Sequence, residues 1–471
     1  MRVLLVNPAI EDGSLGTFAK LMEPMPVVGL AYLAAICERD GHDLCVIDQF
    51  AQRSGPADIA RTAADFGAQV LGIGMLTPAV PTCLAIIDAC RAAIPGLTVL
   101  AGNIHADVFA RDLLEAGSAD VVAHGEAEDT LSEVLAVLEE GDVSGLVGVL
   151  GISWRDRAGE VHRNAARPHR RDLDALPWPA WHRFPVHRYG LLPLADVARP
   201  TLAMTASRGC PYRCEFCSLL HAGANYRARD PVAVVDEYQG LHARYGARQI
   251  GFMDPVFPLH RKGMLAFCEE LMRRGLHKEV VWVSETRVDR IDRETLRIMR
   301  ASGCRRLLLG IESGVDMLLE NVNKTFDTER VRQAVALCRE EGIETIGLFM
   351  IGLPGETPEM TRQTVDFAAS LPLDFAKFAI TVPFPGSQLF EDLSREGRLD
   401  TSDWGDWTTF QPDPARLPYV PRSVDNAYLL RMQKEGTRRF YLRPSMIWHH
   451  LVEVRTLQPR QVWNGMRAVL G

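Results

Sequence analysis

Apolar runs and polar breaks alternate along the first 140 or so of the 471 residues. Short runs of Val, Leu, Ile and Ala end in Gly, Asn or Asp, and stretches with helical spacing, such as 28–38, lie between them. Because the runs are apolar throughout, they predict strands buried on both faces of a parallel sheet. The expected unit is a doubly wound, Rossmann-like domain of residues 1–145. Its predicted strands are 3–6, 43–47, 70–74, 97–101 and 120–122.

A second alternation of strands and helices occupies residues 199–390. Its predicted helices include 232–245 and 328–341. Its six predicted strands are 202–205, 249–253, 280–284, 306–309, 345–350 and 375–382. Since a closed barrel of this type has eight strand–helix units, six predict a partial (βα)6 barrel of the TIM type.

The remaining segments complete an α/β fold class. Residues 146–198 combine Pro and Trp with Arg and His, which predicts an ordered connector whose aromatic side chains pack on a neighbouring domain. Residues 391–471 are expected to form a mainly helical C-terminal region.

Charge and composition narrow the class of protein. The chain has 52 basic and 60 acidic residues, a net charge of −8, and 47% hydrophobic residues. This is ordinary globular composition, and the acidic balance argues against broad binding to nucleic acid. The apolar run near Met1 is too short for the core of a signal peptide, so a cytoplasmic location is expected.

Three of the ten cysteines lie close together in the sequence. Cys210, Cys214 and Cys217 form C-x3-C-x2-C just after the first strand of the second series. Three thiolates leave one iron of a cubane iron–sulfur cluster open to another ligand. The alternative is a structural zinc site, for which His221 is the nearest fourth ligand. The other seven cysteines are expected to fill the core.

The motif, with Phe216 before its last cysteine, resembles the signature of the radical S-adenosylmethionine (SAM) family. The resemblance covers about residues 1–390 and is to the branch with an N-terminal cobalamin-binding domain. That branch includes anaerobic magnesium-protoporphyrin ester cyclases and hopanoid and other C-methylases. The companion segments are Trp-Val-Ser-Glu-Thr-Arg-Val-Asp at 282–289, Gly-Ile-Glu-Ser-Gly at 310–314, Asn-Lys at 323–324, Gly-Leu-Pro-Gly-Glu-Thr at 352–357 and Pro-Phe-Pro-Gly-Ser at 383–387.

The resemblance implies that the three cysteines hold a [4Fe-4S] cluster whose open iron binds SAM. One electron, from a donor such as flavodoxin or ferredoxin, then cleaves SAM to a 5′-deoxyadenosyl radical, which removes hydrogen from the substrate. Phe216 is expected to lie against the adenine, or to pack in the loop.

Carboxylates at strand ends are expected to bind SAM. Glu285 and Glu312 can accept hydrogen bonds from the ribose or the amino group, with Arg287 nearby, whereas the alternative is a buried salt bridge such as Glu285–Arg287. Many family members have Gly-Gly-Glu after the second strand, but this chain has Met-Asp-Pro at 253–255. Asp254 is therefore expected to replace that glutamate, or backbone carbonyls serve instead.

The first domain resembles cobalamin-binding domains. His42 lies in a near match to D-x-H-x-x-G, but Cys45 replaces the final glycine and the segment precedes a strand. Cobalamin is therefore expected to bind without a histidine below the cobalt. No phosphate-binding glycine loop is found. The segment expected below the cobalamin is Met75, Leu76 and Thr77, and the other residues expected at this ligand edge are Gly102, His105, Gly125 and Glu126.

Three functions fit the sequence. The leading hypothesis is methylation of an unactivated carbon, in which one SAM supplies the methyl group through cobalamin and a second supplies the radical. Oxidative cyclisation is the alternative within the family, and a non-catalytic corrinoid and iron–sulfur sensor is the alternative outside it. 5′-Deoxyadenosine formation separates the sensor from the enzymes.

The substrate is expected to be a small or lipid-like molecule, and no nucleic-acid partner is expected. Basic and aromatic residues at 438–443, followed by His449 and His450, suggest weak contact with a membrane surface, although a solvated basic helix face is the favoured interpretation. Trp404, Trp407 and Phe410 either line a substrate pocket or pack on the barrel.

Overall fold

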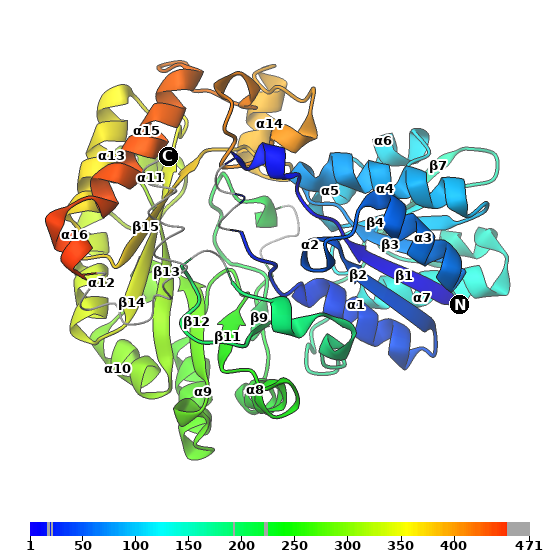
Figure 1. The fold of residues 1–471 in the computed structure, drawn as a ribbon, viewed down its shortest axis with the longest axis horizontal. Coiled ribbons are helices and arrows are strands. Elements are labelled where there is room, and N and C mark those ends of the chain that lie inside the picture. Colours follow the sequence, from blue (N-terminus) through cyan, green and yellow to red (C-terminus); the bar gives the residue numbers. More distant parts are fainter. Residues whose placement is uncertain (17–18, 20–21, 192–193, 221–224, 450–471) are drawn as a thin grey trace.

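The computed structural model describes residues 1–16, 19, 22–191, 194–220 and 225–449, and it consists of two α/β units side by side (Figure 1). The first contains a seven-stranded sheet of order β2-β1-β3-β4-β5-β6-β7. The first five strands of this order are parallel, as predicted. The strands are β1 (Arg2–Asn7), β2 (Asp43–Asp48), β3 (Val70–Gly74), β4 (Thr98–Gly102), β5 (Val121–Ala123), β6 (Ile152–Arg155) and β7 (Val161–Arg163).

Helices cover both faces of this sheet, which confirms the doubly wound arrangement. Along β1, Leu4 and Val6 join the core on one face, and Val3 and Leu5 join the core on the other. This alternation follows from the two-residue repeat of a strand. The helices of this unit are α1 (Val28–Arg39), α2 (Gln49–Gln52), α3 (Pro56–Phe66), α4 (Val80–Ala93), α5 (Asn103–Val108), α6 (Ala110–Glu115) and α7 (Glu128–Glu140).

The connector differs from the expectation, because β6 and β7 add an antiparallel hairpin to the sheet after residue 145. Asp156 makes its turn by accepting hydrogen bonds from the amides of Ala158 and Glu160, both at 2.9 Å. Farther along, Trp181 is fully buried, and the Ala180 amide donates to the carbonyl of Ala31 in α1 at 2.9 Å. The connector thus packs Trp181 on the first unit, whereas Trp178 lies against the second, where Arg244 is 5.0 Å from its ring centre.

The second unit contains an open six-stranded sheet of order β15-β14-β13-β12-β11-β8, parallel throughout. Because β8 and β15 remain edge strands, the barrel is partial, as predicted. The strands are β8 (Thr201–Met204), β11 (Gln249–Phe252), β12 (Val281–Thr286), β13 (Cys304–Glu312), β14 (Glu344–Ile351) and β15 (Phe375–Ile380). Its helices are α8 (Pro231–Tyr245), α9 (Arg261–Arg273), α10 (Arg293–Ala301), α11 (Asp316–Asn321), α12 (Thr328–Glu340) and α13 (Pro358–Ser370).

Two further parts join these units. A short antiparallel hairpin, β9 (Ser207–Arg208) and β10 (Arg227–Ala228), flanks the cysteine motif. The C-terminal region contributes α14 (Gln388–Arg395), α15 (Asn426–Tyr441) and α16 (Pro444–Trp448), and the Tyr441 hydroxyl donates to the carbonyl of Ala376 in β15 at 2.9 Å. Within the described residues, no helix has the length and apolar character needed to cross a membrane.

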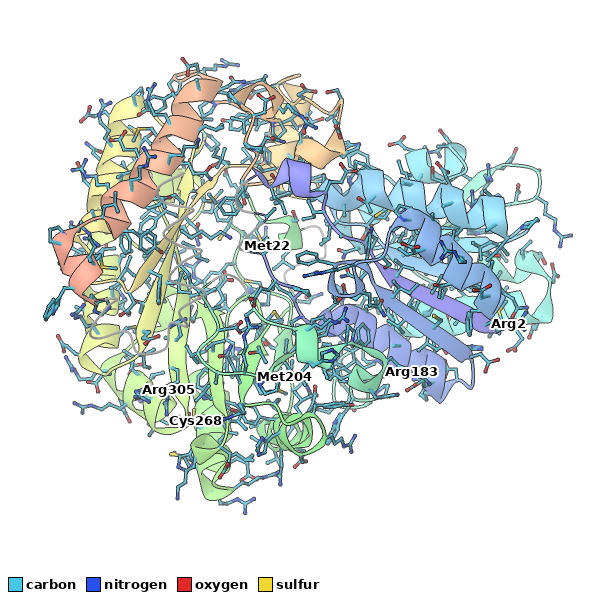
Figure 2. All side chains as sticks on the ribbon, in the orientation of Figure 1. Arg2, Met22, Arg183, Met204, Cys268 and Arg305 are labelled. Carbon is cyan, nitrogen blue, oxygen red and sulfur yellow. The ribbon has the colours of Figure 1, made fainter. Side chains whose placement is uncertain are left out.

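The cysteines outside the motif mostly fill the core, as expected. Six of the seven are buried, and Cys45 is half-buried. Cys268 is an example: it lies on α9 in the lower part of the second unit (Figure 2), where the Ser302 hydroxyl donates to its sulfur at 3.1 Å.

Candidate active site

The cysteine motif begins at a tight backbone contact after β9. Gly209 has a φ of +78°, and a Cβ atom there would lie 2.0 Å from the carbonyl oxygen of Asn225. Only glycine fits this position. Beyond it, the Cys217 amide donates to the Cys214 carbonyl at 3.0 Å, so the motif closes into a compact loop. Cys214 is buried, and Cys210 and Cys217 are half-buried.

The spacing of the three sulfur atoms favours a cluster over a single ion. Within the described residues, Asp156, Glu160 and His162 are the one group of three His, Cys, Asp or Glu residues with ligand atoms all within 4.8 Å of one another. At least one pair of motif sulfurs is therefore farther apart than this. Thiolates around one tetrahedral zinc lie only about 4 Å apart. A wider spacing fits a cubane with a separate iron for each thiolate, and His221 lies outside the described residues.

Arg287 joins the cysteine loop to the end of β12. Its Nη1 atom lies 3.9 Å from the Cys214 sulfur, and its guanidinium stacks 3.6 Å from the ring centre of Tyr212. Asp289 holds the guanidinium through two contacts, at 3.0 and 3.1 Å. Arg287 thus pairs with Asp289, which corrects the alternative of a Glu285–Arg287 salt bridge.

Burial works against thiolate formation in the loop. It raises the pKa of Cys217 to about 11, with a further contribution from the neighbouring thiols, whereas Lys324 acts in the opposite direction. Iron would favour the thiolate form, because metal coordination deprotonates cysteine. The donor set therefore fits a [4Fe-4S] cluster.

Glu312 and Lys324 form a buried ion pair close to the loop. The pairing of β13 with β14 is irregular between Gly310 and Glu312, and Glu312 has a φ of +68°. Its Oε1 atom accepts a hydrogen bond from Lys324 Nζ at 2.9 Å. The same Nζ lies 5.5 Å from the ring centre of Phe216, which precedes the last cysteine.

Glu285 differs from Glu312, because its half-buried carboxylate has no hydrogen-bond partner among the described residues. Burial and then the Glu312 carboxylate raise the pKa of Glu285 to about 7, while Lys324 and Lys377 oppose this rise. Burial in turn lowers the pKa of Lys377, which lies on β15. The barrel interior therefore holds one carboxylate, that of Glu285, which can accept a hydrogen bond from a polar ligand.

Asp254 supports the start of the cysteine loop. Its carboxylate accepts a hydrogen bond from the Ala206 amide at 2.9 Å and another from the Ser207 hydroxyl. Burial raises the pKa of Asp254 to about 6. The loop occupies this carboxylate, whereas the sequence predicted that it binds SAM.

The ligand edge of the first sheet combines a buried layer with one exposed apolar side chain. The Met75 amide donates to the Gly102 carbonyl at 2.8 Å, while Leu76 is 47% exposed. Thr77 is buried, and its hydroxyl lies 3.3 Å from His105 Nδ1. Burial lowers the pKa of His105 to about 4.

This edge fits a large flat cofactor. A Cβ atom at Gly125, where φ is +68°, would meet no atom within 4 Å, and one at Gly102 would meet only a carbonyl oxygen at 3.9 Å. A backbone without side chains here allows a corrin ring to approach. His42 lies at the opposite edge, where its Nδ1 atom is 3.1 Å from the amino group of Met1, so it is remote from this position, as the sequence predicted.

Glu126 connects the two units. Its carboxylate accepts hydrogen bonds from both terminal nitrogens of Arg227, at 3.0 and 2.5 Å, and lies 3.5 Å from Arg208. Glu128 in α7 also accepts from Arg208, at 2.5 Å. We call these four residues the interdomain ion pairs. The sequence predicted that Glu126 binds a cofactor, whereas its carboxylate contacts the hairpin beside the cysteines.

Sequence reasoning overlooked four charged residues of this region. Lys324 belongs to the Asn-Lys segment that resembles the family, and Arg208 lies two residues before Cys210. The sequence around each of them therefore indicated that they lie near the site. Lys377 lies on a predicted strand, but an apolar run does not identify its inward positions. Arg227 had no local signal.

Family comparisons agree with this geometry. Residues 204–368 match the Radical SAM superfamily, and residues 15–135 match the B12 binding domain. An uncharacterised methyltransferase of Pyrococcus horikoshii is 30% identical over 459 residues, which cover 96% of this chain and 95% of that protein. The anaerobic magnesium-protoporphyrin IX monomethyl ester cyclase of Rubrivivax gelatinosus is 28% identical, covering 95% of this chain and 78% of that protein.

Solved structures share the whole fold. The radical S-adenosylmethionine methyltransferase TsrM of Kitasatospora setae has a TM-score of 0.72 and 19% identity, covering 99% of this chain and 96% of that chain. The cobalamin-dependent S-adenosylmethionine radical enzyme OxsB has a TM-score of 0.71 and 17% identity, covering 99% of this chain and 70% of that chain. This chain is therefore a member of the radical SAM superfamily, in the branch that carries an N-terminal B12-binding domain.

Proposed function

We propose that this protein is a cobalamin-dependent radical SAM enzyme that methylates an unactivated carbon of a small molecule. The observation that carries the proposal is the direct connection between its two ligand edges. The loop after β5 pairs Glu126 with Arg227, and that arginine belongs to the hairpin beside the three cysteines. A cofactor on the first sheet then faces the site where a SAM radical forms.

In this proposal Cys210, Cys214 and Cys217 hold the cluster, and Arg287 and Lys324 offset its negative charge. When bound, the cluster and SAM supply a carbon radical, and cobalamin carries the methyl group. Glu285 and Glu312 orient the polar groups of SAM, because both carboxylates lie at strand ends that face the barrel mouth.

Neighbouring residues position these ligands. Phe216 packs against Leu318 and Leu353, which fixes the loop between the second and third cysteines and leaves its ring available to the adenine. Asp254 holds the start of the loop through Ala206 and Ser207.

The edge of the first sheet is proposed to bind cobalamin by the shape of its surface more than by charged side chains. In this proposal the segment of Met75, Leu76 and Thr77 lies below the cobalamin with only Leu76 exposed, and Gly102, His105 and Gly125 lie beside it. Leu76 offers no ligand atom, and His105 is buried against Thr77 and Trp404, so this surface would hold cobalamin mainly by its shape.

Two partners complete the proposed reaction. A one-electron donor such as flavodoxin or ferredoxin reduces the cluster, and a small-molecule substrate enters the barrel. Oxidative cyclisation is the second candidate, because the cyclase of Rubrivivax gelatinosus aligns with 95% of the chain. The fate of the SAM methyl group separates the two reactions.

The first test is metal content. The protein is produced with cobalamin supplied and purified without oxygen, and we expect about four iron atoms and about one cobalt atom per chain. Iron without cobalt after reconstitution would refute the cobalamin proposal. SAM with a labelled methyl group then distinguishes methylation, which transfers the label to the substrate, from cyclisation, which does not.

A further inference from the structure

A C-terminal stretch of the chain, residues 404–412, lies against the ligand edge of the first sheet, and we call it the covering segment. Its 3-10 helix η10 (Trp404–Asp406) packs against η3 (Thr77–Ala79), which follows β3. Farther along, the Thr408 hydroxyl donates to the carbonyl of Ser14, in the loop after β1, at 2.8 Å. The covering segment therefore reaches the ends of two neighbouring strands.

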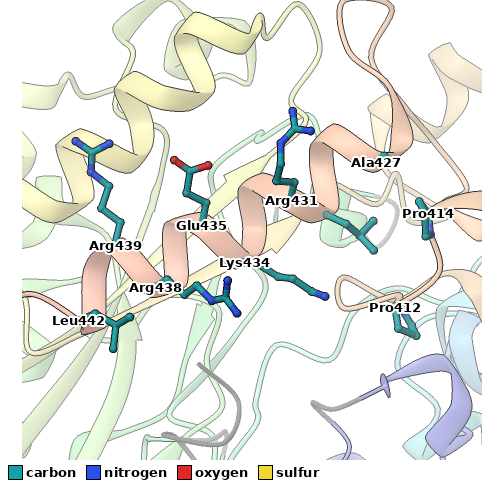
Figure 3. A pocket seen from close by; sticks show the side chains of 10 residues that line it. Pro412, Pro414, Ala427, Arg431, Lys434, Glu435, Arg438, Arg439 and Leu442 are labelled. Carbon is teal, nitrogen blue, oxygen red and sulfur yellow. The ribbon is translucent and has the colours of Figure 1, made fainter. Parts of the chain in front are cut away.

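Two further contacts extend this interface. Pro412 lies beside the start of the chain (Figure 3), where a Cβ atom at Gly16 would be 2.7 Å from its own Cβ atom. The ring centre of Trp404 lies 4.9 Å from the ring centres of both His105, in α5, and Phe109, directly after that helix. Since α5 follows β4, and β1, β3 and β4 are neighbours in the sheet, the covering segment contacts three adjacent strand ends.

The two tryptophans of the covering segment differ. Trp407 is fully buried, and its Nε1 atom donates to the carbonyl of Asp400 at 3.1 Å. Trp404 is half-buried, and its Nε1 atom has no hydrogen-bond partner among the described residues. Tryptophan combines a large apolar ring with one donor, which is why it is frequent in interfaces. Trp404 thus has a donor that a bound molecule can use.

The covering segment and the interdomain ion pairs lie on two sides of the open part of this edge. Leu76, which is 47% exposed, directly precedes η3, on which the covering segment packs. Gly125, where a Cβ atom would meet no atom within 4 Å, directly precedes Glu126 of the ion pairs. A cofactor on this edge therefore meets the covering segment on one side and the ion pairs on the other.

We infer that the covering segment completes the cobalamin site, and that Trp404 packs against the cofactor and donates its Nε1 hydrogen to a carboxamide oxygen at the rim of the corrin ring. The rim carries several carboxamide groups, and their oxygens accept hydrogen bonds. Trp404 lies outside both family matches, which cover residues 15–135 and 204–368. This inference rests on the proposed function, and it adds a cofactor-binding residue from the C-terminal region.

Corrinoid affinity tests the inference on the full-length protein, produced without cobalamin and purified without oxygen. Hydroxocobalamin and cobinamide, which has the corrin ring but lacks the nucleotide, are compared by equilibrium dialysis. Trp404→Phe keeps an aromatic ring but removes the donor, so it should bind both corrinoids about fivefold more weakly, the scale of one hydrogen bond. Trp404→Ala also removes the ring contact and should weaken binding of both by about 30-fold.

The matched controls are Trp178→Phe and Trp178→Ala, because Trp178 is 39% exposed and lies against the second unit. Both should bind like the wild type, and denaturant unfolding should show Trp404→Phe to be as stable as the wild type without cofactor. Unchanged affinity of Trp404→Phe, or equal losses in the Trp178 variants, would overturn the inference. A loss confined to hydroxocobalamin would also overturn it, because Trp404 would then contact the nucleotide. A wild type that binds neither corrinoid would refute the proposed function itself, so the two failures are distinguishable.

Discussion

The protein engages most polar residues of both ligand edges through its own contacts, and the two edges differ in one carboxylate of the second. At the edge of the first sheet, the protein itself engages the polar side chains: Glu126 binds Arg227, and His105 packs between Thr77 and Trp404. At the edge of the second sheet, Glu285 faces the interior without a hydrogen-bond partner among the described residues. At the first edge the polar side chains are bound by other residues of the protein, whereas at the second edge the Glu285 carboxylate can still accept a hydrogen bond from a ligand.

The difference matches the proposed ligands. A corrin ring is large and flat, and in the proposal it binds through extensive contact with backbone and with apolar side chains such as Leu76. SAM is small and carries an amino group, a carboxylate and ribose hydroxyls, so it requires individual charged partners. Each edge therefore has the chemistry of one cofactor, and the interdomain ion pairs hold the two edges together.

The largest expected effect comes from removing the ligands of the second edge. Cys210→Ala, Cys214→Ala and Cys217→Ala should each abolish 5′-deoxyadenosine formation, because two thiolates do not hold a cluster with one defined open iron. Iron content and product release by chromatography are the measurements. Cys45→Ala, a half-buried cysteine outside the motif, is the control and should retain both.

A fully active single variant of the motif would contradict the assignment of all three cysteines. It would also weaken the comparison of the two edges, because the second edge would then have no residue shown to bind the cluster.

The second effect concerns the connection between the edges. Arg227→Gln leaves the Glu126 carboxylate, which is 25% exposed, without its main partner, and should reduce the free energy of unfolding by about 1–3 kcal/mol. Glu126→Gln should have a similar effect, and the double variant should lose less than the sum, because the residues act together. Denaturant unfolding of the four proteins measures this coupling.

Arg171→Gln, an exposed arginine of the connector, is the control and should change the unfolding free energy little. Additive losses at Glu126 and Arg227 would show that the ion pair does not stabilise the docking of the two units.

Much of the fold could be predicted from the sequence because the information is local. Apolar runs identified the five parallel strands of the first sheet and all six of the second, since each strand is buried on both faces. The hairpin of β6 and β7 was missed, because Ser153, Arg155 and His162 interrupt the apolar pattern of an edge hairpin.

The site was predictable only in part, because some of its residues meet through contacts between segments that are distant in the sequence. The cysteine spacing is a local signal that carries its chemistry with it. The partner of Glu126 is 101 residues away, and the pairing exists only because two separate units dock. A strand-end position such as Asp254 indicates the correct edge, but only packing determines whether a carboxylate faces a ligand or the backbone of a loop.

The smallest effect tests the closed character of the first edge through pH. Burial lowers the pKa of His105 from 6.5 to about 4, so the unfolded chain binds a proton between these values that the folded protein does not. Stability should therefore fall as the pH falls through this window, by about 2 kcal/mol between pH 7 and pH 5. His105→Gln should lack this part of the loss, whereas His187→Gln, an exposed histidine, should follow the wild type. Thermal or denaturant unfolding at the two pH values gives the comparison.

An identical pH dependence in His105→Gln and the wild type would contradict the prediction. It would mean that His105 can be protonated in the folded protein, so that the edge of the first sheet would differ from the barrel edge only in its shape.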